Sequence, residues 1–135
     1  MLVVLGDVDA AGVLYFATVY RWHEASLTAW LAEQGQPLEE ILGSDRGLPV
    51  RRSWADYPSP ARLGDTLSVR RAVHALSDTD FVFETTWRQS SSGRVVATVS
   101  TKHVSCERDA RTGVFGRAPI WPDLRMALLA LTARP

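Results

Sequence analysis

The stretch of sequence that decides the fold is GDVDAAGVLYFATVYRWHEASLTAWLAEQG, residues 6–35. Its first part, Gly6–Gly12, has small residues and two carboxylates between two glycines, which is typical of a loop. Its second part, about Phe16–Gln34, contains neither proline nor glycine. Thr18 is the expected N-cap, and Gly35 is the expected stop signal. Apolar or small residues recur at helical spacing, namely Trp22, Ala25, Ser26, Ala29 and Trp30. The stretch therefore predicts a loop followed by one long helix that packs on a sheet.

The segments around this stretch predict strands and two shorter helices. Leu2–Leu5 is a predicted short strand, and Pro37–Leu42 a predicted short helix. After Leu48 the pattern changes to alternation, which is typical of half-buried strands. The predicted strands are Leu48–Tyr57, Thr66–Ala75, Phe81–Gln89 and Arg94–Cys106, the last two joined as a hairpin by the turn Ser90–Gly93. A terminal helix is expected within Pro119–Leu131. This order predicts a single α+β domain, residues 1–135, with an antiparallel sheet wrapped around one long helix.

The composition is that of a globular protein without a charge bias. Lys+Arg and Asp+Glu each number 15, so no global charge attracts nucleic acid or an anionic membrane. Cys106 is the only cysteine, so no intramolecular disulfide forms, as is usual in a reducing compartment. No apolar run approaches the roughly 20 residues that a membrane-spanning helix needs. We expect a cytoplasmic protein with neither a nucleic acid nor a membrane as partner.

The loop before the long helix is the place where chemistry is expected. The first N–H groups of a helix lack partners within the helix and carry a partial positive charge. Asp9 beside such groups would combine a nucleophile or base with a site that polarises a carbonyl. Asp before a helix is, however, usually a cap or turn residue. The local pattern leaves both interpretations of Asp9 open.

Two motifs carry a family resemblance. One is Asp7–Phe16 (DVDAAGVLYF) with the helix start Tyr20–Ala25 (YRWHEA), and the other is Gly64–Val69 (GDTLSV). Together they resemble the Asp-x-Asp-x-x-Gly signature and the Gly-Asp-x-Leu strand entry of the 4-hydroxybenzoyl-CoA thioesterase class of hotdog proteins. The resemblance runs from Leu5 to about Trp121. It implies the hotdog fold, in which an antiparallel sheet wraps around one long central helix.

Further stretches resemble the 1,4-dihydroxy-2-naphthoyl-CoA thioesterases of the quinone pathways within this class. They are Gly12–Phe16, His23–Ala25, Leu48–Val50 and Thr101–Val104. Two other groups of the fold match less well. The Tol–Pal-associated thioesterases usually have His in place of Phe16, and the polyene-releasing thioesterases lack the Asp that matches Asp9. The resemblance therefore implies hydrolysis of an aromatic acyl-CoA.

The resemblance also implies roles at the thioester. The Asp matching Asp9 attacks the carbonyl carbon or activates a water molecule, and the backbone N–H matching Phe16 polarises the carbonyl oxygen. The Gly matching Gly12 lets the backbone pass close to the substrate, and Tyr15 is expected to contact it. A thiolate leaves readily, so this chemistry needs no metal and no cofactor.

Residues beyond the loop carry further expectations. Leu48 and Pro49 are expected to line the acyl pocket, with ordinary packing at a strand entry as the alternative. Glu24, placed on or near the buried side of the helix, either accepts a hydrogen bond from an aryl hydroxyl or is a carboxylate of the helix surface or of a subunit interface. His23–Glu24 begins a zinc-protease motif, but Leu27 stands where the second His would be, so no metal site is expected. His23 is expected to be a packing or interface residue.

The phosphates of CoA need cations, but the sequence assigns none. The candidates are Arg51, Arg52, Arg70, Arg71, Arg88, Arg94 and Lys102. The 4-hydroxybenzoyl enzyme has a basic cluster where this chain has Ser77–Asp80 (SDTD), so its phosphate ligands do not carry over.

A homodimer or homotetramer is expected. A sheet curled on one helix leaves strand edges and an apolar outer face to cover. The family resemblance also implies dimers of dimers with active sites between subunits. Two alternatives to the naphthoyl-CoA assignment stay open: a broader aryl- or fatty-acyl-CoA thioesterase, and a non-catalytic acyl-binding module. Asp9 counts against the second, because binding alone does not need that carboxylate.

Overall fold

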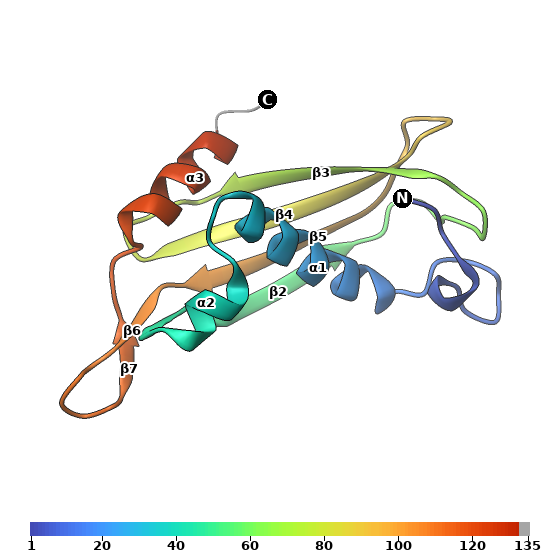
Figure 1. The fold of residues 1–135 in the computed structure, drawn as a ribbon. Helices are drawn as coiled ribbons and strands as arrows, with labels where there is room; N and C mark the ends of the chain where they lie inside the picture. The colour runs from blue at the N-terminus through green and yellow to red at the C-terminus, as the bar shows by residue number, and fades with distance from the viewer. Residues whose placement is uncertain (133–135) are drawn as a thin grey trace.

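Two antiparallel sheets and three α-helices make up the computed structural model, which describes residues 1–132 (Figure 1). The larger sheet has the order β2-β5-β4-β3, with β2 Val50–Asp56, β3 Leu67–His74, β4 Asp80–Gln89 and β5 Val95–Val104. The smaller has the order β1-β6-β7, with β1 Arg46–Gly47, β6 Cys106–Arg108 and β7 Phe115–Arg117. The helices are α1 (Thr18–Glu33), α2 (Leu38–Gly43) and α3 (Pro122–Thr132). Every strand pair is antiparallel, which confirms the predicted α+β class.

The β4–β5 hairpin forms where the Ser/Gly turn predicts it. Gly93 has φ +71°, a backbone conformation that residues other than glycine rarely adopt. Its N–H donates to the Gln89 carbonyl at 2.8 Å. Along β4, Phe81, Phe83 and Trp87 alternate onto one face and are almost fully buried. The local turn and the period of two therefore fix the centre of the sheet.

α1 lies along this face and ends at a glycine motif. The Gln36 N–H donates to the Leu31 carbonyl at 2.9 Å, and the Gly35 N–H donates to the Ala32 carbonyl at 3.0 Å. With Gly35 at φ +70°, these two bonds form a Schellman motif, so the predicted stop is confirmed. The predicted cap is wrong: Ala17 is the N-cap, and Thr18 is the first helical residue and is buried.

The core beneath α1 divides into two apolar clusters. The first centres on Trp30, Phe81, Phe83 and the buried side of α3, and the second on Val19, Trp87 and Val99. The predicted packing stripe is partly wrong, because Ala25 and Ala29 are exposed. A polar residue, His23, separates Val19 from Trp30 along the buried side of α1, which a search for apolar periodicity overlooks.

The opposite face of the large sheet is polar. Glu84 accepts a hydrogen bond from Ser100 at 3.4 Å and lies 3.4 Å from His74, and Thr86 bonds Thr98 at 3.3 Å. Polar groups that already pair with one another do not require an apolar cover. The centre of this face is therefore polar, not apolar as expected.

Two predicted strands differ from the structure. Leu2–Leu5 forms a single bridge, Leu2 with Thr66, before the 3₁₀ turn η1 (Leu5–Asp7). The strand predicted over Arg94–Cys106 ends at Val104, because the Ser105 N–H turns to the Thr79 carbonyl at 2.7 Å and the Ser105 carbonyl accepts from Ala118. Cys106 then begins β6 of the small sheet, which the sequence did not predict.

Candidate functional site

The segment before α1 folds into a tight hairpin loop that lies at one end of the large sheet (Figure 1), and Asp9 begins the turn of this loop. The Asp9 N–H donates to the Val13 carbonyl at 2.9 Å, and the Gly12 N–H donates to the Asp9 carbonyl at 2.9 Å. Gly12 has φ +71°, which closes the turn without strain. The Asp9 side chain is exposed, and its Oδ1 accepts the Ala11 N–H at 2.8 Å. Among the described residues the carboxylate bonds no N–H of α1, so the expected juxtaposition with the helix start is not formed within this chain.

Asp7 differs from Asp9 although both belong to the same loop. Its side chain is buried, and Oδ2 accepts the Val4 N–H at 2.9 Å. The Asp7 carbonyl accepts the Tyr15 N–H at 2.8 Å, which holds the returning arm of the hairpin. Asp7 therefore shapes the loop, whereas the Asp9 carboxylate faces solvent.

The segment between the loop and α1 offers an unused donor. Tyr15 and Phe16 are 44% and 59% exposed, and their rings meet edge to face with centroids 4.9 Å apart. No described group accepts a hydrogen bond from the Phe16 N–H. A free N–H next to a helix start is suited to bind a carbonyl oxygen that gains negative charge.

Tyr57, which the sequence did not single out, holds this segment. It follows β2, and its hydroxyl donates to the Phe16 carbonyl at 2.9 Å. Burial, followed by the neighbouring Tyr20, raises the pKa of Tyr57, so the hydroxyl keeps its proton at neutral pH. Tyr57 also lines a cavity of about 270 Å³ beside the loop, together with Val13, Leu14, Ser59, Pro60, Ala61 and Val96.

Leu48 and Pro49 lie at the other end of the sheet. They connect β1 to β2, and β2 then runs seven residues to the end where Tyr57 meets Phe16. At about 3.3 Å per residue, a strand of this length spans roughly 20 Å. Leu48 is half-buried against the first apolar cluster, and Pro49 is exposed. Within one chain, Leu48 and Pro49 therefore do not share a pocket with Asp9.

Glu24 and His23 are neighbours on α1 but differ in burial. Glu24 is exposed, which corrects its predicted placement on or near the buried side. His23 is only 3% exposed and hydrogen-bonds two threonines, so it is a buried polar residue of the packing. Desolvation by burial, with a smaller contribution from His103, lowers the pKa of His23 from 6.5 to about 4.

Several candidate phosphate ligands are engaged in the structure. Arg71 forms an ion pair with Glu33 at 2.8 Å and donates to Ser26 at 3.0 Å. The Arg52 guanidinium lies over the Trp54 ring, 5.1 Å from its centroid. Arg88 and Arg94 contact the Gln89–Gly93 turn.

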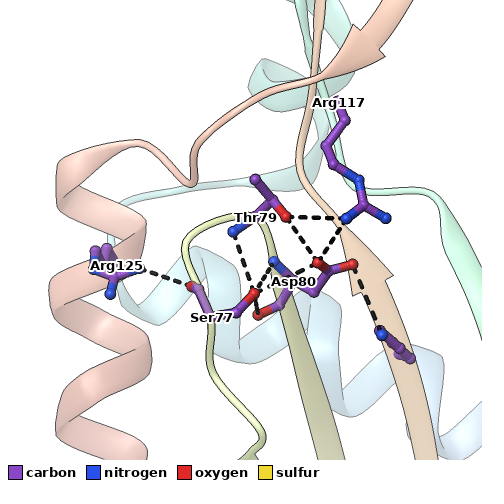
Figure 2. A network of polar contacts seen from close by, with 6 residues as sticks. Ser77, Thr79, Asp80, Arg117 and Arg125 are labelled. Atoms are coloured by element: carbon purple, nitrogen blue, oxygen red, sulfur yellow. Dashed lines mark hydrogen bonds and ion pairs between the residues drawn. The ribbon is translucent and has the colours of Figure 1, made fainter.

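The Ser77–Asp80 turn, which stands in place of the family's basic cluster, gathers cations from three elements. Asp80 is 8% exposed and lies 3.2 Å from Arg117 and 4.0 Å from Lys102. Arg125 of α3 donates to the Ser77 carbonyl at 2.8 Å (Figure 2). The Thr79 hydroxyl donates to Asp80 and, with the two cations, holds the pKa of Asp80 below its usual value. The turn thus connects β4 to β5, β7 and α3.

Two kinds of feature are not found among residues 1–132. No group of three or more His, Cys, Asp or Glu residues in this part of the chain is placed to hold a metal ion. None of the helices described is both long and apolar enough to cross a membrane.

Comparisons with known proteins agree with the motifs. The chain is 34% identical over 131 residues to a 1,4-dihydroxy-2-naphthoyl-CoA hydrolase of Synechococcus elongatus, covering 95% of this chain and 90% of the relative. A solved 1,4-dihydroxy-2-naphthoyl-CoA thioesterase from Synechocystis superposes with a TM-score of 0.84 at 27% identity, covering 97% of this chain and 93% of that one. A gentisyl-coenzyme A thioesterase superposes with a TM-score of 0.77 at 26% identity, covering 96% and 97% of the two chains.

These likenesses extend over the whole α+β domain and support the hotdog fold. The model of one family, the thioesterase-like superfamily, matches residues 3–128. That range includes the Asp9 loop, all three helices up to Leu128 and both sheets. The resemblance seen in the motifs is confirmed, and the chain belongs to the thioesterase-like superfamily.

Proposed function

We propose that this protein hydrolyses an aromatic acyl-CoA to the free acid and CoA, with 1,4-dihydroxy-2-naphthoyl-CoA as the expected substrate. The observation that carries the proposal is the 34% identity to a hydrolase of that name over 95% of this chain. The family model, which matches residues 3–128, includes the Asp9 loop. Residence in the cytoplasm is part of the proposal, and a single cysteine supports it. A single domain with α1 as its central helix is also part of it, supported by the packing of α1 on β4 and β5.

In the proposed mechanism Asp9 drives the chemical step. Its carboxylate either attacks the thioester carbon, which expels the CoA thiolate and forms an anhydride with Asp9 that water then hydrolyses to the free acid, or takes a proton from a water molecule that attacks the carbon as the CoA thiolate leaves. The Phe16 N–H stabilises the negative charge on the carbonyl oxygen. Gly12 keeps the turn open to the thioester, and Tyr15 contacts the acyl group. The exposure of Asp9 and the free Phe16 N–H support these roles.

A second copy of the chain is part of the proposal, because Leu48 and Pro49 lie roughly 20 Å from the loop along β2. The described strands pair with only one side of β2, so its other edge has open backbone groups. Antiparallel pairing of this edge with the same edge of a partner would set the start of one β2 beside the end of the other. Leu48 and Pro49 of one copy would then line the acyl pocket beside Asp9 of the other. We infer a homodimer that pairs further into a tetramer. Exposed Glu24 is then available at a subunit interface or to an aryl hydroxyl.

A broader aryl-CoA specificity is the second candidate. It is favoured by the similar fold, at 26% identity, of a protein named as a gentisyl-coenzyme A thioesterase. Turnover of a panel of aryl- and alkyl-CoA esters separates the two candidates.

Asp9→Asn tests the proposal directly. Asn keeps the turn bond to Ala11 but removes the charge, so a turn residue would tolerate the change. A catalytic Asp9 predicts a fall in turnover of ~100-fold or more. Asp7→Asn is the matched control, since its oxygen still accepts the Val4 N–H, and near-native turnover is expected. A folded Asp9→Asn variant with near-native turnover on its best acyl-CoA would refute the proposal.

A further inference from the structure

Buried polar groups form a continuous hydrogen-bonded chain beneath α1, at the boundary between the two apolar clusters. His23 Nδ1 lies 3.0 Å from Thr85 Oγ1, and His23 Nε2 lies 2.9 Å from Thr101 Oγ1. Thr101 Oγ1 lies 2.8 Å from His103 Nε2, and His103 Nδ1 lies 3.0 Å from the Leu48 carbonyl oxygen. The chain thus connects α1, β4 and β5 to the segment between β1 and β2.

The chemistry of its last member fixes every proton along the chain. A carbonyl oxygen only accepts, so His103 Nδ1 carries the hydrogen. Neutral His103 then accepts at Nε2, and the single hydrogen of Thr101 points to it. The Thr101 oxygen in turn accepts from His23 Nε2, which leaves His23 Nδ1 to accept from the Thr85 hydroxyl. The two histidines therefore have opposite tautomers.

Both rings are held neutral by their surroundings. His103 is 4% exposed and stacks on Phe81 with centroids 5.1 Å apart, and the His23 ring lies 5.7 Å from that of Phe83. A proton added to His103 Nε2 would face the hydroxyl hydrogen that Thr101 donates to this nitrogen. Burial lowers the pKa of both histidines. The donor-to-acceptor order of these hydrogen bonds is therefore stable at neutral pH.

The last bond of this hydrogen-bonded network, from His103 to Leu48, holds a segment without regular structure. Leu48 and Pro49 lie between strands, and the register of β2 with β5 shifts directly after Val50. Only two hydrogen bonds to the described residues anchor this segment: the Leu48 carbonyl accepts from His103, and the Pro49 carbonyl accepts from the Val104 N–H at 3.1 Å. The side-chain bond is the one that reaches into the core.

We propose that Thr101 and His103, oriented by His23, are positioning residues that hold Leu48 and Pro49 in the shape that selects the acyl group. This inference rests on the proposed function, in which Leu48 and Pro49 line the acyl pocket. The chain also joins three of the stretches that resemble naphthoyl-CoA thioesterases: His23–Ala25, Leu48–Val50 and Thr101–Val104.

The tautomers are tested by ¹⁵N NMR of the histidine rings in the wild-type protein at pH 7. His103 is expected to be protonated at Nδ1 and His23 at Nε2. Protonation of His103 at Nε2 instead would overturn the proposal, because the bond to Leu48 would not exist.

The positioning role is tested by Thr101→Val, which keeps the shape of the side chain and removes the hydroxyl. KM for 1,4-dihydroxy-2-naphthoyl-CoA is expected to rise about five- to tenfold with kcat changed much less, as when one buried hydrogen bond is lost. The preference for this ester over benzoyl-CoA is expected to fall. Thr101→Ser keeps the hydroxyl and restores both values. Thr98→Val is the matched control on the other face of β5, where the hydroxyl bonds Thr86 and no other group of residues 1–132.

The outcomes separate this inference from the proposed function. An active wild-type enzyme whose Thr101→Val variant keeps KM and substrate preference would overturn the positioning role alone. A wild-type protein that hydrolyses none of the acyl-CoA esters would refute the proposed function, and the positioning role with it. A rise in KM that Thr101→Ser reverses and Thr98→Val does not reproduce would support the inference.

Discussion

Tyr57 is far from Phe16 in the sequence but contacts it in the fold. Its hydroxyl donates to the Phe16 carbonyl at 2.9 Å, which restrains the backbone on the C-terminal side of the free N–H. An N–H group stabilises a developing charge best when it is already oriented before the reaction. At the scale of a single residue, Tyr57 therefore positions the donor rather than contributing one.

Tyr57→Phe removes this hydroxyl and leaves the ring. We expect kcat to fall about five- to tenfold, the effect of losing one hydrogen bond, with a smaller change in KM. Steady-state kinetics on the best acyl-CoA measure both values. Tyr20→Phe is the matched control, because no described hydrogen bond involves the Tyr20 hydroxyl. Equal kinetics in Tyr57→Phe and wild type would contradict the positioning of Phe16 by Tyr57.

At the scale of elements, Asp80 and the turn before it, Ser77–Asp80, tie β4 to β7 and α3 and add side-chain contacts to its pairing with β5. It begins β4, accepts from Thr79, and lies beside Arg117 of β7 and Lys102 of β5, while Arg125 of α3 bonds the same turn (Figure 2). One oxygen, Oδ1, has no hydrogen-bond partner among the described residues, which leaves Lys102 at 4.0 Å as its nearest compensating charge. Charge-assisted hydrogen bonds of this turn therefore connect the small sheet and α3 to the large sheet.

Asp80→Asn is expected to lower the free energy of unfolding by about 1–3 kcal/mol, since charge-assisted hydrogen bonds are lost from a mostly buried group. Urea denaturation at pH 7 measures the change. Asp78→Asn is the control, because the Asp78 side chain is 90% exposed in its pair with Arg125, and such pairs contribute about 0–1 kcal/mol. Equal losses in the two variants would contradict a special role for Asp80.

Packing of α1 on the sheet makes stability depend on pH. Folded His23 has a pKa of about 4 against 6.5 for the free side chain, so between these values the unfolded state binds more protons. Stability is therefore complete above pH 6.5 and falls as the pH drops toward 4. From pH 7 to pH 5, His23 alone accounts for a loss of about 2 kcal/mol. Urea denaturation of the wild type at the two pH values should detect it, and His23→Gln should reduce the difference. An equal free energy of unfolding at pH 5 and pH 7 in the wild type would contradict this.

The elements that local sequence predicts are those whose signals are local. The β4–β5 hairpin follows from its turn and alternation, and the end of α1 follows from Gly35. β1 is two residues long and pairs with distant β6, and β7 is three residues long and pairs with β6 across a short turn, so neither is long enough to show a periodicity. The buried side of α1 was misplaced because His23 is buried through partners on β4 and β5 that only the register brings together.

The candidate site follows the same division. One short stretch of sequence contains the proposed residues Asp9, Gly12, Tyr15 and Phe16, so a single motif predicts them together. The fold keeps this stretch at one end of the sheet. Tyr57 and the chain from His23 to Leu48 depend on pairing across the fold, which one sequence does not specify. Leu48 and Pro49 were assigned to the pocket without a sign that the length of β2 separates them from Asp9. Whether Leu48 and Pro49 join the site depends on how two copies of the protein assemble.

At the scale of the whole molecule, a site shared between two copies predicts complementation between variants. Asp9→Asn removes the proposed catalytic carboxylate, and Pro49→Trp is expected to fill the proposed acyl pocket from an exposed position of the other copy. Each homodimer should then have turnover reduced ~100-fold or more.

A heterodimer of the two variants contains one site with both defects and one site with neither. Unfolding the variants together and refolding them at equal concentrations should therefore restore about a quarter of the wild-type turnover, since about half of the dimers are mixed and each has one intact site. Light scattering on the same samples checks that they are dimers or larger, against 14.9 kDa for one chain. Two Asp9→Asn copies refolded alone are the control and should stay inactive. If the mixture is no more active than its components while light scattering shows assembly, Asp9 and Pro49 do not meet across subunits, and the acyl pocket must be built within one chain.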